Sequence, residues 1–199
     1  MSAWASLAQK HSSRSKDCAS LIIPRLYLSG FSTAMDDELI SQLGITHVVS
    51  VLDWAPEFSA SIPVPNRLHI NLSDYSTSNI LAHLDTTTEF VKAALEENES
   101  NVVLVHCFQG VSRSATVVCA YLISNAGMTA MESITFVQSK RKIVSPNNGF
   151  RKQLYLYATR LRDNALLSPT VDAEATEENT AVDGTQRTPV SLGISSEYP

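Results

Sequence analysis

The chain has 199 residues, of which 44% are hydrophobic and 18% are charged, as is usual for one globular domain with its own core. It lacks an apolar run near the roughly 18 residues that cross a bilayer, so we expect no membrane partner. The formal net charge of −5 equals that of residues 164–199 alone. The formally neutral remainder has no basic field, which argues against a nucleic-acid partner.

The two ends of the chain differ in composition from its middle. Residues 1–19 are rich in Ser, Ala and basic residues, which predicts a flexible N-terminal arm. A mitochondrial transit peptide is the alternative, because Trp4, Leu7 and Arg14 contribute to a faint amphipathic pattern. Residues 164–199 are acidic and poor in large apolar side chains, which predicts a disordered tail.

The cysteine content bears on the compartment. Cys18, Cys107 and Cys119 make an odd number, and no secretory signal precedes them. This combination favours a reducing compartment, so we expect the cytoplasm or the nucleus. The sequence does not indicate an oligomeric state.

Between these ends, strand-like and helix-like segments alternate. Strands are expected at residues 22–28, 45–52, 67–72 and 102–105. Helices are expected from Ser32 or Thr33 to Gly44, and at residues 79–97, 114–126, 129–142 and 151–162. Pro24 is typical of an edge strand, and the capping box formed by Thr129 and Glu132 marks a helix start. This alternation predicts an α/β domain with a largely parallel sheet over residues 20–163.

The stretch around Cys107 carries the chemistry. Residues 102–105 are typical of a fully buried strand, and the chain from Ser114 onward is typical of a buried helix. The loop between them contains Gly110 and ends at Arg113. Such a loop directs backbone N–H groups toward one point, where the helix dipole adds partial positive charge. The sequence therefore predicts a socket for a tetrahedral phosphate dianion.

Three side chains of this stretch suit phosphoryl transfer. The positive field of the socket also stabilises a thiolate, which makes Cys107 a nucleophile aimed at phosphorus. The planar fork of Arg113 matches two phosphate oxygens, and Ser114 can donate its hydroxyl to the sulfur. Because the amides and Arg113 supply the positive charge, we expect no metal and no other cofactor.

The segment from His106 to Ser114 resembles the His-Cys-x5-Arg-Ser/Thr phosphate-binding loop of the cysteine-dependent protein tyrosine phosphatases. Residues 120–123 resemble the dual-specificity branch, and segments 26–30, 43–49 and 146–150 also look like features of that family. The resemblance covers residues 20–163 nearly end to end. It implies an atypical dual-specificity phosphatase: a single α/β domain whose central, largely parallel twisted sheet is flanked by helices.

The resemblance also implies roles for the residues of the loop and its surroundings. Cys107 is the nucleophile, and Arg113 binds the phosphate together with the loop residues Phe108, Gln109, Gly110, Val111 and Ser112. His106 orders the loop through hydrogen bonds. Asn148 braces the loop from a later turn, with a plain turn residue as the alternative.

A thiolate that displaces an alcohol also needs a carboxylic acid to protonate the leaving oxygen. Asp74 directly follows the strand at 67–72, and the resemblance assigns the general acid to it. Asp53, which follows the preceding strand, is the alternative, whereas Asp85 lies within a predicted helix and is less able to move. After the first step, Asp74 is expected to act as the base that activates water.

We therefore expect a protein phosphatase for phosphotyrosine and phosphoserine or phosphothreonine monoesters, with a phosphorylated protein as partner. The five residues between Cys107 and Arg113 include no base, whereas similar phosphatases for inositol lipids and other polyanions tend to carry one. The alternatives are a phosphatase for lipid, RNA 5′-end or glycan phosphate, and a phosphoprotein-binding scaffold with little turnover. The basic run at residues 140–142 forms either a second anion site or a complement to a helix C-terminus.

Overall fold

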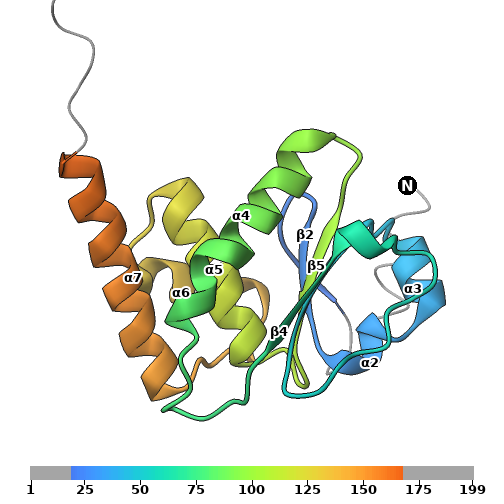
Figure 1. Cartoon of the computed structure of the whole chain (residues 1–199), viewed down its shortest axis with the longest axis horizontal. Coiled ribbons are helices and arrows are strands. Elements are labelled where there is room, and N and C mark those ends of the chain that lie inside the picture. Colours follow the sequence, from blue (N-terminus) through green and yellow to red (C-terminus); the bar gives the residue numbers. More distant parts are fainter. Residues whose placement is uncertain (1–18, 168–199) are drawn as a thin grey trace, which may run out of the picture. The chain divides into compact units, whose positions relative to one another are not determined.

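The computed structural model describes residues 19–167, so the predicted arm and most of the predicted tail lie outside the described residues. Figure 1 shows a central twisted sheet with helices on both faces. The sheet has five strands in the order β1-β2-β5-β3-β4. The fold class predicted from the sequence is confirmed.

The strands are β1 (Ser20–Ile23), β2 (Leu26–Ser29), β3 (His47–Leu52), β4 (Arg67–Asn71) and β5 (Val103–His106). The β2–β5, β3–β5 and β3–β4 pairs are parallel, and β1 pairs with β2 in the antiparallel direction. Every residue of β3 and β5 is buried, as their continuous apolar runs predict. Because parallel strands end at the same edge, the loops after β3, β4 and β5 meet there.

The single strand predicted at residues 22–28 is wrong. The chain turns back between β1 and β2, and Pro24 lies in this turn. Arg25 adopts φ 67°, an uncommon conformation for a residue with a side chain. Its Nη1 donates hydrogen bonds to the carbonyl oxygens of Leu95 (3.0 Å) and Asn98 (3.1 Å). These bonds tie the turn to the C-terminal end of the helix at Leu81–Glu97.

The helices are α2 (Phe31–Ala34), α3 (Asp37–Gln42), α4 (Leu81–Glu97), α5 (Arg113–Ala126), α6 (Ala130–Lys140) and α7 (Asn148–Leu167), with a 3₁₀ turn at Val64–Asn66. The first predicted helix is in fact two, because Asp36 caps α3 by accepting a hydrogen bond from the Leu39 amide. The capping box of α6 is confirmed. The last helix, predicted at residues 151–162, is longer at both ends, since α7 runs from Asn148 to Leu167. The helix therefore continues past the domain boundary expected at residue 163.

Helix α5 forms the centre of the core. Every residue from Arg113 to Ile123 is buried, because α5 packs on the sheet and is covered by α4, α6 and α7. Burial raises the pKa of Cys119, in the middle of α5, to about 12, so this thiol stays protonated in the folded protein at neutral pH. Cys119 is therefore a packing residue.

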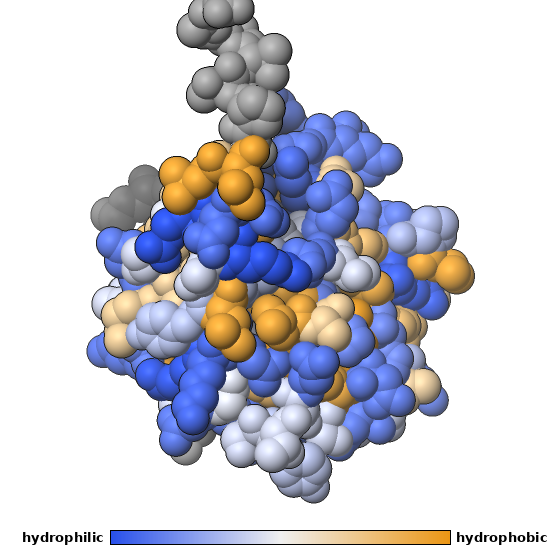
Figure 2. All heavy atoms as spheres, turned by 60° about the vertical axis from the view of Figure 1, so that its left-hand side comes forward, coloured by the Kyte–Doolittle hydropathy of each residue, from blue (hydrophilic) through white to orange (hydrophobic). Residues whose placement is uncertain are grey.

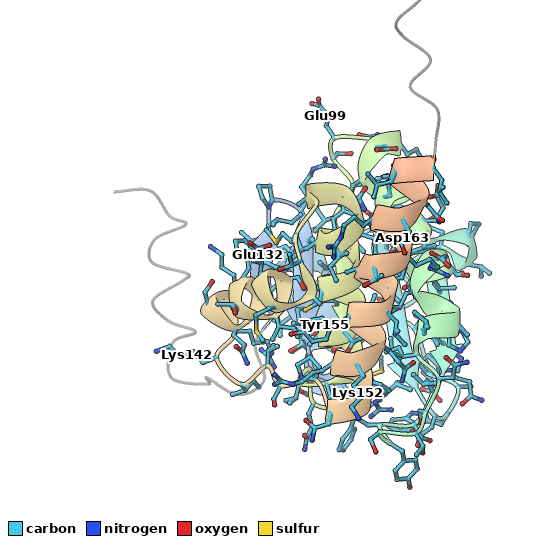
Figure 3. The ribbon with its side chains drawn as sticks, turned by 90° about the vertical axis from the view of Figure 1, so that its left-hand side faces the viewer. Glu99, Glu132, Lys142, Lys152, Tyr155 and Asp163 are labelled. Atoms are coloured by element: carbon cyan, nitrogen blue, oxygen red, sulfur yellow. The ribbon has the colours of Figure 1, made fainter. Side chains whose placement is uncertain are left out.

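Hydrophilic side chains cover most of the face shown in Figure 2, where apolar side chains form small groups. Lys152, Tyr155 and Asp163 lie along the outer side of α7 (Figure 3). Among the helices of residues 19–167, none combines the length and the apolar character needed to cross a membrane.

Candidate active site

The loop after β5 is pressed against the end of β2. Gly110 has φ 66°, and a Cβ atom there would lie 2.4 Å from the carbonyl oxygen of Ser29, so only glycine fits. The amide of Phe31 donates a 3.0 Å hydrogen bond to the carbonyl oxygen of Phe108. These contacts fix the catalytic loop, residues 107–112, from outside.

Cys107 directly follows the central strand β5, and its side chain is 1% exposed. Its sulfur accepts a hydrogen bond from the Gly110 amide (3.3 Å) and another from the Ser114 hydroxyl (3.1 Å). Both donors stabilise negative charge on the sulfur. The structure thus places Ser114 beside the thiol that the sequence predicts as the nucleophile.

Arg113 is buried at the start of α5. Its Nη1 donates a 3.0 Å hydrogen bond to the carbonyl oxygen of Leu72 and lies 3.6 Å from an Asp53 oxygen. Its Nε lies 3.9 Å from an Asp74 oxygen and has no hydrogen-bond acceptor among residues 19–167. A buried donor without an acceptor is costly, so Nε is suited to bind an oxygen of an incoming phosphate.

Asp74 is linked to the catalytic loop itself. Its Oδ1 accepts hydrogen bonds from the Ser112 hydroxyl (2.7 Å) and from Nδ2 of Asn147 (2.8 Å). The hydroxyl oxygen of Ser112 also accepts a hydrogen bond from the backbone N–H of Asn147 (3.1 Å). The carboxylate therefore lies at the rim of the loop that holds Cys107.

The other two candidate acids have different surroundings. A hydrogen bond from its own backbone amide, another from the Ser73 hydroxyl and the charge of Arg113 lower the pKa of Asp53, which makes it a poorer proton donor. Asp85 on α4 pairs with Arg160 on α7, with both oxygens 2.7 Å from Nη2. Asp53 thus orients Arg113 at the edge of the site, and Asp85 joins two helices.

His106 is fully buried at the end of β5. Its Nε2 lies 2.5 Å from the Ser50 hydroxyl, on the residue paired with it across β3 and β5. Burial lowers the pKa of His106 to about 4, so its ring is neutral at neutral pH. The histidine therefore ties two strand ends together below the loop.

Residues 26–160 match the family described as "Dual specificity phosphatase, catalytic domain". The chain belongs to this family. The match covers more than half of the chain and includes the catalytic loop, both candidate acids at the sheet edge and the turn before α7. The family suspected from the residues around Cys107 is thereby confirmed.

Relatives in the dual specificity phosphatase family are similar over the same part of the chain. Tyrosine-protein phosphatase yvh1 of Schizosaccharomyces pombe is 35% identical over 136 residues, which is 68% of this chain and 40% of that protein. Dual specificity protein phosphatase 22-B of Danio rerio is 33% identical over 138 residues, 69% of this chain and 73% of that protein. The chain thus spans less than half the length of the first relative.

A solved structure has a similar fold. The human tyrosine phosphatase-like serine/threonine/tyrosine-interacting protein superposes with a TM-score of 0.66 and 30% identity, over 71% of this chain and 96% of that one. Its description as phosphatase-like and interacting shows that similarity of fold does not decide between catalysis and binding. The choice between catalysis and binding therefore depends on the residues of the site.

The bracing role predicted for Asn148 falls on Asn147. Helix α7 begins at Asn148, whose side chain is exposed, whereas Oδ1 of Asn147 caps the helix by accepting a hydrogen bond from the Phe150 amide (2.9 Å). The cap position turns the Asn147 amide group toward Asp74. Asparagine is a strong N-cap residue, but both positions carry one, so the preference alone does not select Asn147 over Asn148.

Arg141 is a site residue that the sequence did not indicate. It is buried, and its Nε donates to the carbonyl oxygen of Gly110 (3.0 Å) while its Nη2 donates to that of Gln109 (3.3 Å). Holding these carbonyls outward leaves the loop amides free to face a phosphate. The run at residues 140–142 lies at the C-terminus of α6, with Lys140 in the last turn, as one of the two interpretations expects, and Lys142 points to solvent (Figure 3).

Gly149 keeps the loop of Asp74 close to α7. A Cβ atom at Gly149 would lie 1.8 Å from the Ser76 carbonyl oxygen, so Gly149→Ala must displace residues 73–78. We expect kcat/KM for an aryl phosphate to fall roughly 10-fold to 100-fold, because small misplacements of a catalytic group are costly. Steady-state assays of the purified variant measure this loss.

Gly127→Ala is the control for adding a methyl group where it meets nothing: Gly127 has a positive φ, unlike Gly149, and no atom lies within 4 Å of its Cβ position. It should cost about 1 kcal/mol in stability and leave kcat/KM near the original value. A folded Gly149→Ala protein with full activity would show that this close approach does not position the acid.

Proposed function

We propose that this protein removes phosphate from tyrosine, serine and threonine side chains of proteins through a cysteinyl-phosphate intermediate. The observation that carries the proposal is the arrangement around one loop. The sulfur of Cys107 accepts a hydrogen bond from the Gly110 amide, Asp74 is bonded to Ser112 of the same loop, and the Nε of Arg113 lies 3.9 Å from Asp74 with no acceptor among residues 19–167. Nucleophile, anion-binding group and proton donor are thus brought together.

The first step forms the phosphoenzyme. The Cys107 thiolate attacks phosphorus in line, and the bond from phosphorus to the ester oxygen breaks. Arg113, whose Nε has no acceptor among residues 19–167, and the loop amides stabilise the charge on the equatorial oxygens, as preorganised donors in a buried loop. Asp74 transfers its proton to the leaving oxygen, so the alcohol or phenol departs neutral.

The second step releases phosphate. Asp74, now a carboxylate, accepts a proton from water as that water attacks phosphorus, and the bond from sulfur to phosphorus breaks. The Ser114 hydroxyl, 3.1 Å from the sulfur, stabilises the departing thiolate. Asp74 is reprotonated in the process and the enzyme returns to its starting state.

The substrate class is supported by the rim of the loop. The five residues between Cys107 and Arg113 are uncharged, and Phe108 is 55% exposed, so the mouth suits a single phosphate on a protein side chain better than a polyphosphorylated headgroup. The intact Cys107, Arg113 and Asp74 favour an enzyme over a binding scaffold. We also propose a reducing compartment, the cytoplasm or the nucleus, because the buried thiols of Cys107 and Cys119 are both free.

The test is hydrolysis of para-nitrophenyl phosphate by the purified protein near pH 6, with and without EDTA. We expect turnover that the chelator does not change, because amides and Arg113 supply the positive charge. Phosphopeptides should then be hydrolysed in preference to phosphoinositides and 5′-phosphorylated RNA. Activity that EDTA removes, or a preference for a non-protein phosphate, would contradict the proposal.

A further inference from the structure

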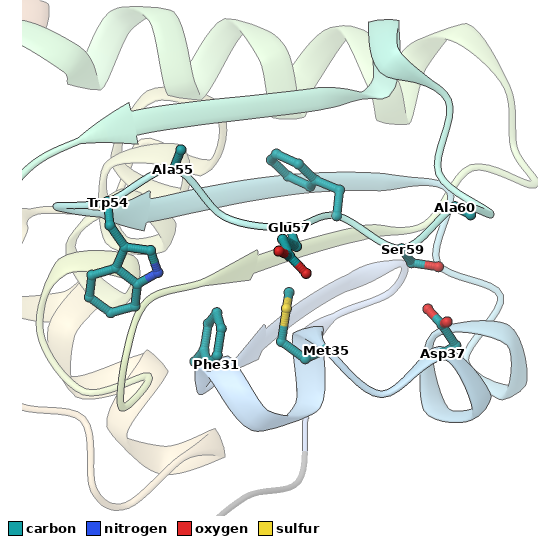
Figure 4. Close-up of a pocket in the computed structure, with 9 residues that line it drawn as sticks. Phe31, Met35, Asp37, Trp54, Ala55, Glu57, Ser59 and Ala60 are labelled. Carbon is teal, nitrogen blue, oxygen red and sulfur yellow. The ribbon is translucent and has the colours of Figure 1, made fainter.

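A pocket of about 550 Å³ lies beside the catalytic loop, outside the site described above (Figure 4). Its walls come from α2, the start of α3 and residues 54–60 of the loop after β3. The apolar part of the lining comes from the side chains of Phe31, Met35, Trp54 and Phe58. This volume is in the usual range for a ligand site.

Aromatic contacts connect this pocket to the catalytic loop. The Trp54 ring packs edge-on against Phe31 in the pocket, with centroids 5.8 Å apart, and against Phe108 in the loop, at 6.0 Å. Phe108 directly follows the nucleophile in the sequence, and Trp54 follows Asp53, which lies 3.6 Å from Arg113. The exposed ring of Phe108, next to the nucleophile, therefore adjoins Trp54 and the pocket behind it.

The polar lining of the pocket is acidic. Glu57 enters from the loop after β3 and Asp37 from the first turn of α3, on different walls (Figure 4). Neither carboxylate has a hydrogen bond or ion pair within residues 19–167. Arg67 stacks on Phe58 at 5.4 Å but bonds the Ser59 carbonyl oxygen (3.2 Å), so it braces the loop instead of neutralising these acids.

We propose that this pocket binds an arginine side chain of the phosphoprotein substrate, near the residue that carries the phosphate. A guanidinium stacks well on aromatic rings and forms planar bonds to carboxylates, and the pocket offers Trp54 and Phe31 at one end, Asp37 at the other and Glu57 between them (Figure 4). Phe108 and Phe31 are linked through Trp54 by ring contacts of 6.0 Å and 5.8 Å. Because an extended chain spans about 3.3–3.6 Å per residue, the arginine should lie within about four residues of the phosphorylated residue.

This inference rests on the proposed function, since it names the substrate sequence that the same site selects. Its test uses neutral phosphotyrosine peptides that carry one arginine, moved through the positions on either side of the phosphotyrosine. Each peptide is paired with one that has citrulline, the uncharged analogue, at the same place. We expect kcat/KM to be roughly ten-fold higher for arginine at the best position, and the ratio to fall as salt rises.

The double variant Asp37→Asn with Glu57→Gln should bring the arginine-to-citrulline ratio close to one. Glu38→Gln removes the same kind of charge from the adjacent position on α3, outside the pocket, and should keep the original ratio. Equal kcat/KM for arginine and citrulline peptides in the original protein would overturn the inference. A ratio that the double variant leaves unchanged would overturn it as well.

Binding of the same peptides to Cys107→Ser separates this inference from the proposed function. Tighter binding of arginine peptides, measured by fluorescence anisotropy, supports the pocket even if the original protein hydrolyses no peptide. Hydrolysis of all the peptides without any arginine preference in rate or binding leaves the phosphatase proposal intact and contradicts the pocket.

Discussion

Cys107→Ser is expected to lower the rate of phosphate ester hydrolysis by roughly 10⁴-fold or more, which is the largest effect of any single substitution in the site. A serine hydroxyl is far less acidic than a thiol, so no comparable anion forms in the field of the loop amides. The Gly110 amide and Ser114 hydroxyl that now bond the sulfur would still bond an oxygen, so the phosphate socket should persist. The measurement is single-turnover and steady-state hydrolysis of an aryl phosphate.

Cys119→Ala is the matched control for the loss of a thiol. Cys119 is buried in α5, and burial raises its pKa to about 12, so it supplies no thiolate at neutral pH. This variant should lose some stability from the small cavity and keep its catalytic rate. More than about 1% residual activity in pure Cys107→Ser would contradict the role of Cys107 as nucleophile.

Asp74→Asn is expected to reduce kcat by roughly 10²-fold to 10³-fold, within the usual range for loss of a general acid. An asparagine can still accept the hydrogen bonds from Ser112 and Asn147 through its Oδ1, so the loop geometry should survive while the proton is lost. The loss should be larger for phenyl phosphate than for para-nitrophenyl phosphate, because a para-nitrophenolate leaves readily without a proton. Comparing kcat for the two esters measures this dependence.

Asp53→Asn distinguishes the two acids at the sheet edge. Asp53 lies 3.6 Å from Arg113, so its loss should weaken phosphate binding moderately. The substitution should not change the dependence of kcat on the leaving group, because Asp53 is a poor proton donor. Its pKa is lowered by hydrogen bonds from its own backbone amide and from the Ser73 hydroxyl, and by the nearby charge of Arg113. The assignment of the acid would be contradicted if Asp74→Asn reduced kcat equally for both esters. A reduction that depends on the leaving group in Asp53→Asn instead would contradict it as well.

The parts of the site that depend on local sequence could be predicted well. The loop from Cys107 to Arg113 follows from a buried strand, a glycine and a helix start that are contiguous in the chain. Asp74 could be placed because it follows a strand, and parallel strands end at one edge of a sheet. The alternation of strands and helices, which the structure confirms, was enough to place the loop and both Asp53 and Asp74, whereas the choice of Asp74 rested on the resemblance to the family.

What the sequence did not indicate depends on tertiary contacts. Arg141 lies between two lysines, so its burial against the carbonyls of Gln109 and Gly110 has no local signal. The turn before β2 was missed because Arg25 adopts a positive φ that its contacts with the end of α4 sustain. The pocket behind Trp54 was missed because a proline-rich loop shows no periodicity that would place its side chains.

The catalytic loop is held by residues from both ends of the domain. Ser29 lies against Gly110, and Asn147 bonds Ser112 from the turn before the last helix. Arg141 joins the loop carbonyls to the hydroxyl of Ser20, 121 positions earlier in the chain. No fragment shorter than residues 20–147 contains all of these supports, and contacts so distant in sequence are slow to form. During synthesis or refolding, we therefore expect phosphatase activity to appear only after the first strand and the turn before the last helix have both docked.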